Sequence, residues 1–237
     1  MLIFAHISDT HLDGGERAAA RTRAVTGYLA HLAAPIDAVL VTGDIADHGL
    51  AEEYKEAREA LELPYPVMIL PGNHDNREEF QNWFGPVNVV REVDGARFLL
   101  CDSTIPGRDD GYLPDETLAW IDAELAASDA PSFVCFHHPP VMLHNTLVDS
   151  LRQTGEERLS AVLAKHAHLT AVLCGHAHTA AVSTFAGKPM LVGGGVVSTL
   201  LLPWETGEHI TLDDPPVIAF HVLDDANRLT THYRIVR

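Results

Sequence analysis

Residues 67–75 read VMILPGNHD, a short apolar run that ends in a cluster of polar side chains. Four consecutive apolar residues followed by a Pro-Gly pair are typical of a buried strand that enters a turn. Asn73, His74 and Asp75 then stand just beyond the carboxyl end of that strand. In open α/β sheets, functional sites form at this edge. The stretch therefore predicts an α/β fold with a polar site at one edge of a sheet.

The segments before this stretch repeat the same alternation of short strands and helices. Residues 2–7 and 38–41 are apolar and predict two more buried strands, whereas residues 16–32 and 52–61 have the spacing of helices. This strand–helix–strand–helix–strand order predicts parallel pairing with helices on the faces of the sheet.

The second half predicts further strands and two more helices. The Asp-Gly pair at 94–95 is a strong hairpin signal, and residues 225–227 form a second turn before the last strand. The expected strands span 87–93, 97–102, 132–136, 169–173, 181–185, 189–192, 217–223 and 228–235, and the expected helices span 114–127 and 156–166. The chain has no internal repeat or long linker, so we expect a single domain over residues 1–237.

Bulk composition narrows the possible partners. The chain is 46% hydrophobic and carries a net charge of -17, which argues against a nucleic-acid polymer or an anionic membrane surface as partner. No stretch is long and apolar enough to span a bilayer, and the first residues lack the pattern of a secretory leader. We therefore expect a cytoplasmic enzyme. Its three cysteines, Cys101, Cys135 and Cys174, lie in apolar runs and are expected to be buried free thiols.

Five polar clusters each follow an expected strand, so their side chains are predicted to converge at one edge. The clusters are residues 9–11, 43–44, 72–75, 137–138 and 175–178. Seven residues in these clusters are candidate metal ligands: Asp9, His11, Asp44, Asn73, His137, His176 and His178. The set offers nitrogen and oxygen donors and no thiolate. It favours two Mn, Fe, Zn or Co ions over a structural zinc or an all-oxygen calcium site.

The spacing within these clusters suggests how two ions would share the ligands. Asp9 and His11 are two residues apart, so in an extended segment their side chains point the same way. Asp44 follows a glycine at a turn and could bridge two ions through its two oxygens. His176 and His178 repeat the two-residue spacing and could each reach a different ion.

The expected charge of such a centre suits an anionic substrate. Two dications, two carboxylates and a bridging hydroxide leave a net charge of roughly +1, which favours a singly charged phosphodiester. Paired ions can also clamp the attacking and leaving oxygens and lower the pKa of bound water.

Each cluster alone has a simpler explanation. Asp9 could cap a helix, the Gly-Asp pair at 43–44 could be a generic turn, and the rings of His137 and His138 could merely pack in a loop. The joint occurrence of all five clusters, in order and each at an expected strand end, favours the metal site.

The order of these clusters from Asp9 to His178 resembles the calcineurin-like metallophosphoesterase superfamily. The resemblance implies a four-layer α/β/β/α sandwich with two mixed sheets. It also implies that His74 contacts the phosphate and assists the leaving group, that Asp75 orients His74, and that Asn73 contacts substrate as well as metal. The implied first metal site comprises Asp9, His11, Asp44 and His178, and the second comprises Asp44, Asn73, His137 and His176.

Within that superfamily the chain most resembles the bacterial class III cyclic-nucleotide phosphodiesterases. Residues 43–49 with Glu53-Tyr54, and residues 137–140 with Asp149, carry this resemblance, which glycerophosphodiester-cleaving relatives share. The tail from Thr211 favours the cyclic-nucleotide branch, whereas the glycine run at 193–195 departs from it. The implied activity is hydrolysis of a 3′,5′-cyclic nucleotide such as cAMP by metal-bound hydroxide, and relatives of this kind are often oligomers.

Three other functions remain open at this point: a glycerophosphodiesterase, a phosphomonoesterase and, remotely, a non-catalytic scaffold. Outside the metal ligands, His48, His144 and Asn145 are weaker candidates for substrate contact, and Trp204 is the best-placed tryptophan for stacking on a base. His138 precedes a proline, so its ring is expected to point away from that of His137.

Overall fold

The strand from Val67 to Leu70, labelled β3, forms one edge of a five-stranded sheet. The structure is a computed structural model that describes residues 1–237. The sheet order is β15-β14-β1-β2-β3, in which β1, β2 and β3 run parallel and β14 and β15 run antiparallel to their neighbours. The other strands of this sheet are β1 (Leu2–Ile7), β2 (Ala38–Thr42), β14 (Val217–Leu223) and β15 (Leu229–Ile235).

A second sheet of six strands lies against the first, in the order β10-β11-β9-β7-β5-β4. Its inner strands are parallel, and antiparallel strands close both edges, so both sheets are mixed. These strands are β4 (Val89–Val93), β5 (Ala96–Leu100), β7 (Ser132–Cys135), β9 (Leu169–Cys174), β10 (Ala181–Phe185) and β11 (Lys188–Val192). Two short pairs complete the strands: β6 (Gly111–Tyr112) with β8 (Gln153–Thr154), and β12 (Thr199–Leu200) with β13 (Ile210–Thr211).

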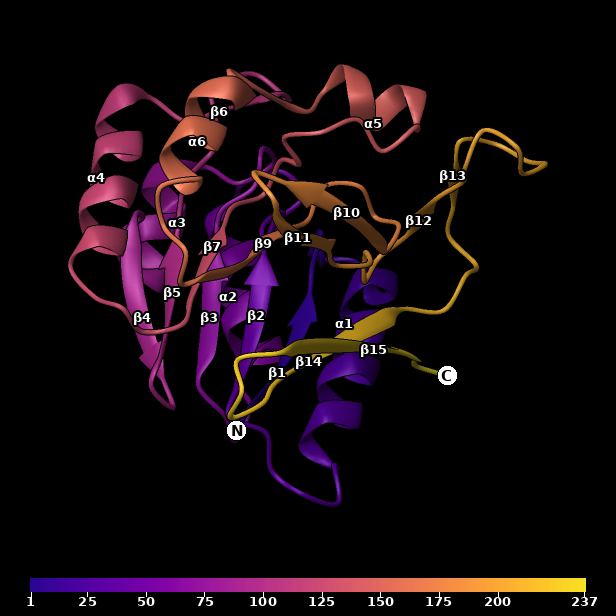
Figure 1. The fold of residues 1–237 in the computed structure, drawn as a ribbon. Helices are drawn as coiled ribbons and strands as arrows, with labels where there is room; N and C mark the ends of the chain where they lie inside the picture. Colours follow the sequence, from indigo (N-terminus) through magenta and orange to yellow (C-terminus); the bar gives the residue numbers. More distant parts are fainter.

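Helices cover the outer faces of the two sheets (Figure 1). The helices on the first sheet are α1 (Glu16–Ala30), α2 (Ala51–Ala60) and α3 (Arg77–Phe84), and those on the second are α4 (Asp115–Ala126) and α6 (Glu156–Leu163). The short α5 (Thr146–Ser150) lies above the second sheet, next to the arm that carries β12 and β13 (Figure 1).

Side chains alternate along each strand and so fill three interfaces. These lie between the first sheet and its helices, between the two sheets, and between the second sheet and its helices. In β2, Val39 and Val41 pack with the helices of the first sheet, while Leu40 between them packs against the second sheet. Phe4, on β1, meets Phe98 and Phe133 across the seam between the sheets, with ring centroids 5.0 and 5.2 Å away. The predicted four-layer α/β/β/α sandwich is confirmed.

Most expected elements form within one or two residues of their predicted ends, as is usual for helix and strand boundaries. The prediction missed α3 and α5, which are short and mostly polar. Each begins at an asparagine, Asn76 or Asn145, whose side-chain oxygen accepts from two backbone N–H groups of the first turn. The three cysteines are buried and free, as expected. None of the helices is both long and apolar enough to cross a bilayer.

Candidate metal centre

The loops after β1, β2, β3, β7 and β9 meet where the two sheets share an upper edge, and all seven candidate ligands lie on these loops. Backbone hydrogen bonds fix them side by side. Asp9 N–H donates to the Gly43 carbonyl at 3.1 Å, and Gly175 N–H donates to the His137 carbonyl at 2.9 Å. The predicted convergence of strand ends is therefore present in the structure.

Glycines allow these loops to approach more closely than side chains would permit. Gly43 has a φ of +91°, and a Cβ there would lie 2.3 Å from Nδ1 of His137. A Cβ on Gly175 would lie 1.9 Å from Oγ of Ser8, across the seam between the sheets. Both positions need glycine because backbone passes directly against neighbouring atoms.

One cluster of ligands gathers Asp9, His11, Asp44 and His178. Nε2 of His11 lies 3.5 Å from Oδ2 of Asp44, and Nε2 of His178 lies 3.5 Å from Oδ1 of Asp9. The two Nε2 atoms are 3.3 Å apart. These are the four residues predicted for the first ion, and their donor atoms face a common point.

A second cluster gathers His137, His138 and His176 beside the first. Nε2 of His137 lies 3.3 Å from Oδ2 of Asp44, the same oxygen that faces His11, so Asp44 faces both clusters. The expected use of both oxygens is not seen, because Oδ1 accepts the His74 backbone N–H at 3.0 Å. Oδ1 of Asn73 lies 3.1 Å from Nε2 of His138, which places Asn73 at the edge of this cluster.

The expectation that the His138 ring points away from His137 is wrong. The two ring centroids are 4.8 Å apart, and His138 is buried with its Nδ1 2.8 Å from Oγ of Ser103. The chain bends at His137 and His138 instead of continuing as a strand, so the alternation of side chains no longer applies.

Several ligand atoms are buried without any hydrogen-bond partner. They are Oδ1 of Asp9, Nε2 of His137 and Nε2 of His176. An unpaired buried polar atom costs roughly 1–3 kcal/mol, so three at one point call for an explanation. Carboxylate oxygen and imidazole nitrogen are the donors that divalent transition metals prefer. The residues present therefore fit divalent metal ions.

The other nitrogen of three of these imidazoles is held by a neighbouring group. Nδ1 of His137 donates to the Thr42 carbonyl at 2.7 Å, and Nδ1 of His11 donates to the Asp47 carboxylate at 2.8 Å. Nδ1 of His178 is hydrogen-bonded to Ser198 at 2.7 Å. The contacts of His137 and His11 fix both the ring and the tautomer and leave Nε2 for the metal, whereas the Ser198 contact fixes only the His178 ring.

The backbone at the centre is held in the left-handed region at non-glycine residues, which is uncommon and costs of order 1–3 kcal/mol each. Five of the candidate ligands have φ between 39° and 67°: Asp9, His11, Asp44, His176 and His178. Strain of this kind persists only where surrounding contacts impose it. Half of the ten non-glycine residues with positive φ are candidate ligands in the two clusters, as is typical of a functional site.

Asp47 is a residue of this site to which the sequence analysis gave no role. Its carboxylate accepts from His11, and its backbone carbonyl accepts from Nδ1 of His74 at 2.8 Å. Burial alone would lower the pKa of His11, but Asp47, Asp44 and Asp9 together raise it to about 8. The position of Asp47 in the sequence could have indicated a role in the site, because Asp47 belongs to the 43–49 motif and stands three residues after Asp44.

Asp75 does not orient His74 as expected. Its carboxylate accepts backbone N–H groups from Gly72 at 2.8 Å and from Ile45 and Ala46 at 3.1 Å each. Burial and the nearby Asp44 raise the pKa of Asp75 to about 6, against the opposing effect of these donors. Asp75 thus ties the loop after β3 to the loop after β2, and Asp47 holds His74.

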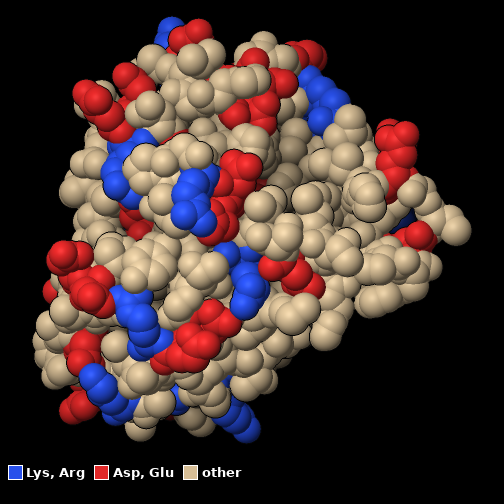
Figure 2. Space-filling model, turned by 90° about the horizontal axis from the view of Figure 1, so that it is seen from above, with Lys and Arg blue, Asp and Glu red and all other residues tan.

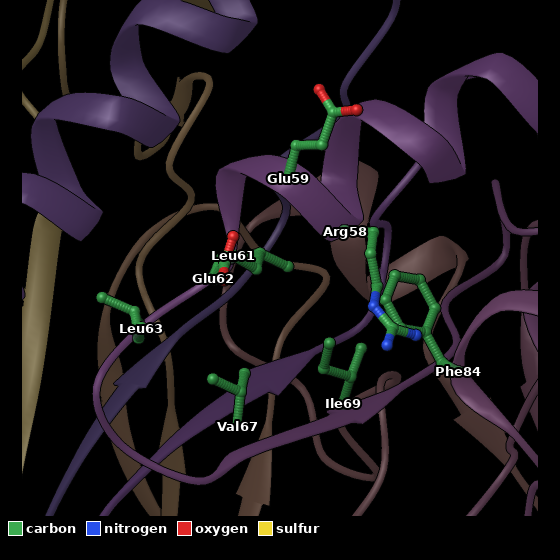
Figure 3. Close-up of a pocket in the computed structure, with 8 residues that line it drawn as sticks. All are labelled: Arg58, Glu59, Leu61, Glu62, Leu63, Val67, Ile69 and Phe84. Carbon is green, nitrogen blue, oxygen red and sulfur yellow. The ribbon is translucent and has the colours of Figure 1, made fainter.

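A cavity of about 490 Å³ opens above the centre, and His11, Asp44, Asn73, His74, His176 and His178 line its floor. A second hollow, of about 470 Å³, lies between the end of α2, β3 and the end of α3 (Figure 3). Its lining is mainly apolar, with Val67 and Ile69 side by side on β3, and it contains none of the candidate ligands. The chemistry-bearing groups therefore belong to the first cavity.

None of the weaker substrate-contact candidates, His48, His144, Asn145 and Trp204, lines that cavity. Nδ1 of His48 is 2.8 Å from the Glu53 carboxylate, and both side-chain ends of Asn145 bind backbone atoms. Trp204 is 72% exposed on the β12–β13 arm.

A sequence profile described as "Calcineurin-like phosphoesterase" matches residues 2–180, a range that includes every candidate ligand. The chain belongs to the calcineurin-like phosphoesterase family. The matched range contains all of the loops that carry the candidate ligands.

Two relatives resemble the chain in sequence, and one solved structure resembles it in fold. A glycerophosphodiester phosphodiesterase GpdQ of Enterobacter lignolyticus is 36% identical over 188 residues, covering 71% of this chain and 68% of the relative. A probable cyclic nucleotide phosphodiesterase of Rhodococcus erythropolis is 33% identical over 232 residues, covering 85% and 73%. The fold matches a dimetal phosphatase from Danio rerio with a TM-score of 0.78 at 16% identity, covering 100% of this chain and 96% of that one.

Proposed function

We propose that the chain is a dinuclear metal-dependent phosphodiesterase that hydrolyses 3′,5′-cyclic nucleotides such as cAMP. The observation that carries this proposal is the pair of ligand clusters joined by Asp44, with His74 beside them in the same cavity. The relative named as a probable cyclic nucleotide phosphodiesterase, similar over 85% of this chain, supports the choice of substrate.

The ligand assignment is the one predicted from sequence. Asp9, His11, Asp44 and His178 would hold one divalent ion, and Asp44, Asn73, His137 and His176 the other. When bound, such ions lower the pKa of bound water and neutralise charge on the phosphate. Mn, Fe, Zn and Co all suit this donor set.

His74 is the proposed proton donor to the leaving oxygen. Its Nδ1 donates to the Asp47 carbonyl, so the ring is held with Nε2 available to a phosphate in the cavity. The side chain is 41% exposed, which leaves it accessible to substrate. Asn73, next to it, would contact both metal and phosphate.

The proposed substrate is a small molecule and not a nucleic-acid polymer. Figure 2 shows basic side chains scattered among acidic ones over the face seen from above, without a continuous basic patch. With a net charge of -17, the chain has no broad positive field to hold a polyanion, and bound metals would supply the positive charge locally. We infer further that residues 1–237 act as a single domain.

The first experiment strips the purified protein of metal, adds Mn²⁺ back, and measures hydrolysis of cAMP beside a generic aryl phosphodiester. We expect no turnover without metal and turnover of both substrates with it. Turnover of the aryl diester alone would keep the metal mechanism and reject the cyclic-nucleotide substrate. A metal-loaded protein inactive on every phosphoester would indicate a scaffold.

A second candidate function is cleavage of glycerophosphodiesters, which the 36% identical GpdQ relative favours. The same centre would serve either diester, because substrate choice depends on the walls of the cavity. Comparing kcat/KM for cAMP, a glycerophosphodiester and a phosphomonoester separates the three activities.

Replacing His74 tests its role. His74→Ala is expected to keep its bound metal and lose between about a hundred- and ten-thousandfold in kcat, the usual contribution of a positioned acid. Metal content and kcat are measured together. His232→Ala, on exposed β15, is the control and should match the parent. Equal turnover by His74→Ala and the parent would remove His74 from the mechanism.

A further inference from the structure

The cavity above the centre has two apolar walls that the metal chemistry does not require. One wall comes from α5 and the residue after it, and the other comes from the arm that carries β12 and β13 (Figure 1). The aliphatic residues lining these walls are Leu147, Val148, Leu151, Leu200, Ile210 and Leu212. They face the same space as the candidate metal ligands.

Three of these side chains are unusually exposed for large aliphatic residues. Leu147 is 45%, Ile210 44% and Leu212 48% exposed. Single exposed aliphatic residues are common, but several around one cavity of ligand size are typical of a binding site. Here they sit at the rim of a cavity with a catalytic floor, which points to a part of the substrate as what covers them.

The two walls are fixed to each other. Asn145 caps α5, with its side-chain oxygen accepting from Leu147 N–H at 3.2 Å and Val148 N–H at 3.5 Å. Its side-chain nitrogen donates to the Leu201 carbonyl on the arm at 3.1 Å. One buried amide therefore sets the distance between α5 and the arm.

Two arginines of α1 hold both ends of the arm, before β12 and after β13. Arg17 donates to the carbonyls of Val197 and Leu212 at 2.5 and 3.1 Å. Arg21 donates to the carbonyls of Val196, Leu212 and Asp214 at 2.7, 3.3 and 2.5 Å. The arm is thus anchored before substrate arrives, and binding between its walls requires little ordering of the chain.

Charge around the cavity argues for a neutral group between the walls. The acidic side chains among the lining residues, apart from Asp44 at the centre, are Asp13, Asp47 and Asp109, and the one cationic side chain is Arg17. Arg17 already binds two carbonyls. A second phosphate would meet carboxylates without a free cation, whereas an uncharged flat ring would bury apolar surface.

We propose that the α5 wall and the β12–β13 wall together hold the nucleobase of a cyclic nucleotide, with Leu147 and Ile210 as specificity-determining residues. This inference rests on the proposed phosphodiesterase function and adds the means by which the site selects nucleotides over smaller diesters. Contact through aliphatic side chains predicts recognition of a flat uncharged ring with little discrimination between bases.

The test compares two substrates that share a reacting centre and differ only in the base: cAMP and 1-O-methylribose 3′,5′-cyclic phosphate. For Leu147→Ser and Ile210→Ser we expect kcat/KM on cAMP to fall about tenfold, mainly through KM, with a change of less than about twofold on the abasic compound. Val182→Ser, 63% exposed on β10 outside the cavity, is the matched control.

The conservative variants Leu147→Met and Ile210→Val should keep most of the preference for cAMP, because they keep an apolar surface at the walls. Metal content and the thermal midpoint are measured for every variant, and both replaced side chains are exposed enough for folding to survive. Equal losses on both substrates, or no loss on cAMP, would overturn the proposal.

Failure of this inference differs from failure of the proposed function. If the parent hydrolyses cAMP and the abasic compound with equal efficiency, the diesterase stands and the base-binding walls do not. If the parent favours glycerophosphoethanolamine over both, the acidic side chains that line the cavity are selecting a cation, and the inference is rejected. If the metal-loaded parent cleaves no diester, the proposed function itself fails.

Discussion

At the scale of single residues, Asp47 connects the candidate metal ligand His11 to His74, the proposed proton donor. Its carboxylate fixes the His11 ring, and its backbone carbonyl fixes the His74 ring. The carboxylate accepts its hydrogen bond from His11 and also lies 3.6 Å from Nδ1 of His74, whereas the carbonyl that holds His74 survives any side-chain replacement. Replacing the side chain should therefore affect metal binding more strongly than the position of His74.

We expect Asp47→Asn to weaken metal affinity by about 10- to 100-fold, as is typical when the partner of a ligating histidine is altered. Because the Asp47 carbonyl remains, kcat at saturating metal should fall much less than in His74→Ala. Metal titration followed by activity measures both quantities. Asp13→Asn, which removes a similar charge from the same cavity without touching a ligand, is the control. An equal effect of both changes would contradict the role of the Asp47 carboxylate in holding His11.

The convergence of the seven candidate ligands could be predicted because each follows an apolar strand, and strand ends meet at one edge of a sheet. The positions of Asp75 and His138 could not, because each depends on how a loop bends after its strand. The Asp75 carboxylate turned toward backbone N–H groups of a neighbouring loop, and the His138 ring entered the centre through a bend. Periodicity describes strands and helices and carries little information about such turns.

At the scale of elements, the contact between the upper ends of β1, β2 and β9 depends on a glycine. The carbonyl of Thr42, at the end of β2, accepts from Ser8 at 3.0 Å and from His137 at 2.7 Å. Gly175, which follows β9, passes against both Ser8 and Thr42. The two sheets are therefore in direct contact next to the candidate ligands.

Gly175→Ala should destabilise the protein by about 1–3 kcal/mol, because the added methyl overlaps Ser8 and the Thr42 carbonyl. Activity should fall as well, since the ligand loops would be pushed apart. Gly27→Ala is the control, because that glycine lies within α1 with open space around it. It should be neutral or stabilising by up to about 1 kcal/mol. Urea unfolding of both variants measures the difference, and similar stabilities would argue against a close contact.

Strand prediction succeeded where burial is continuous, as in β2 and β9, because parallel strands covered on both faces are uniformly apolar. Helix prediction missed α3 and α5, which have 8 and 5 residues. Helices this short depend on their caps and on tertiary contacts more than on a periodic apolar face.

At the scale of the whole molecule, a buried chain of side chains crosses the first sheet. Nε2 of His6 is 2.8 Å from Oγ1 of Thr42, and Nδ1 of His6 is 3.3 Å from Nε2 of His221. Nδ1 of His221 is in turn 2.8 Å from Oγ1 of Thr231, so the chain joins β2, β1, β14 and β15. Burial lowers the pKa of His6 to about 3 and holds that of His221 well below its usual range.

These two histidines should make stability depend on pH. The unfolded chain takes up protons on them as the pH falls below about 6.5, whereas the folded chain keeps them neutral. Their contribution to the free energy of unfolding is therefore complete above that pH and is lost as the pH falls toward 3. For His6 alone, the free energy of unfolding should drop by about 2 kcal/mol between pH 7 and pH 5.

Urea unfolding at several pH values measures this dependence in the parent and in His6→Gln, which keeps a hydrogen-bonding side chain that does not titrate. The parent should show the steeper loss below pH 6.5, and comparison of the two cancels the shared contribution of the metal ligands. Identical slopes would show that His6 is not responsible.

The three buried thiols of the second sheet have a consequence for measuring how the molecule opens. Cys135 and Cys174 are the last residues of β7 and β9, and Cys101 directly follows the neighbouring strand β5. Burial holds the pKa of each thiol above its usual range. A thiol reagent can reach them only when the sheet separates. The rate of alkylation, divided by that of a free thiol, would report the opening equilibrium of the central layer. The native cysteines can thus report unfolding of the protein without an attached probe.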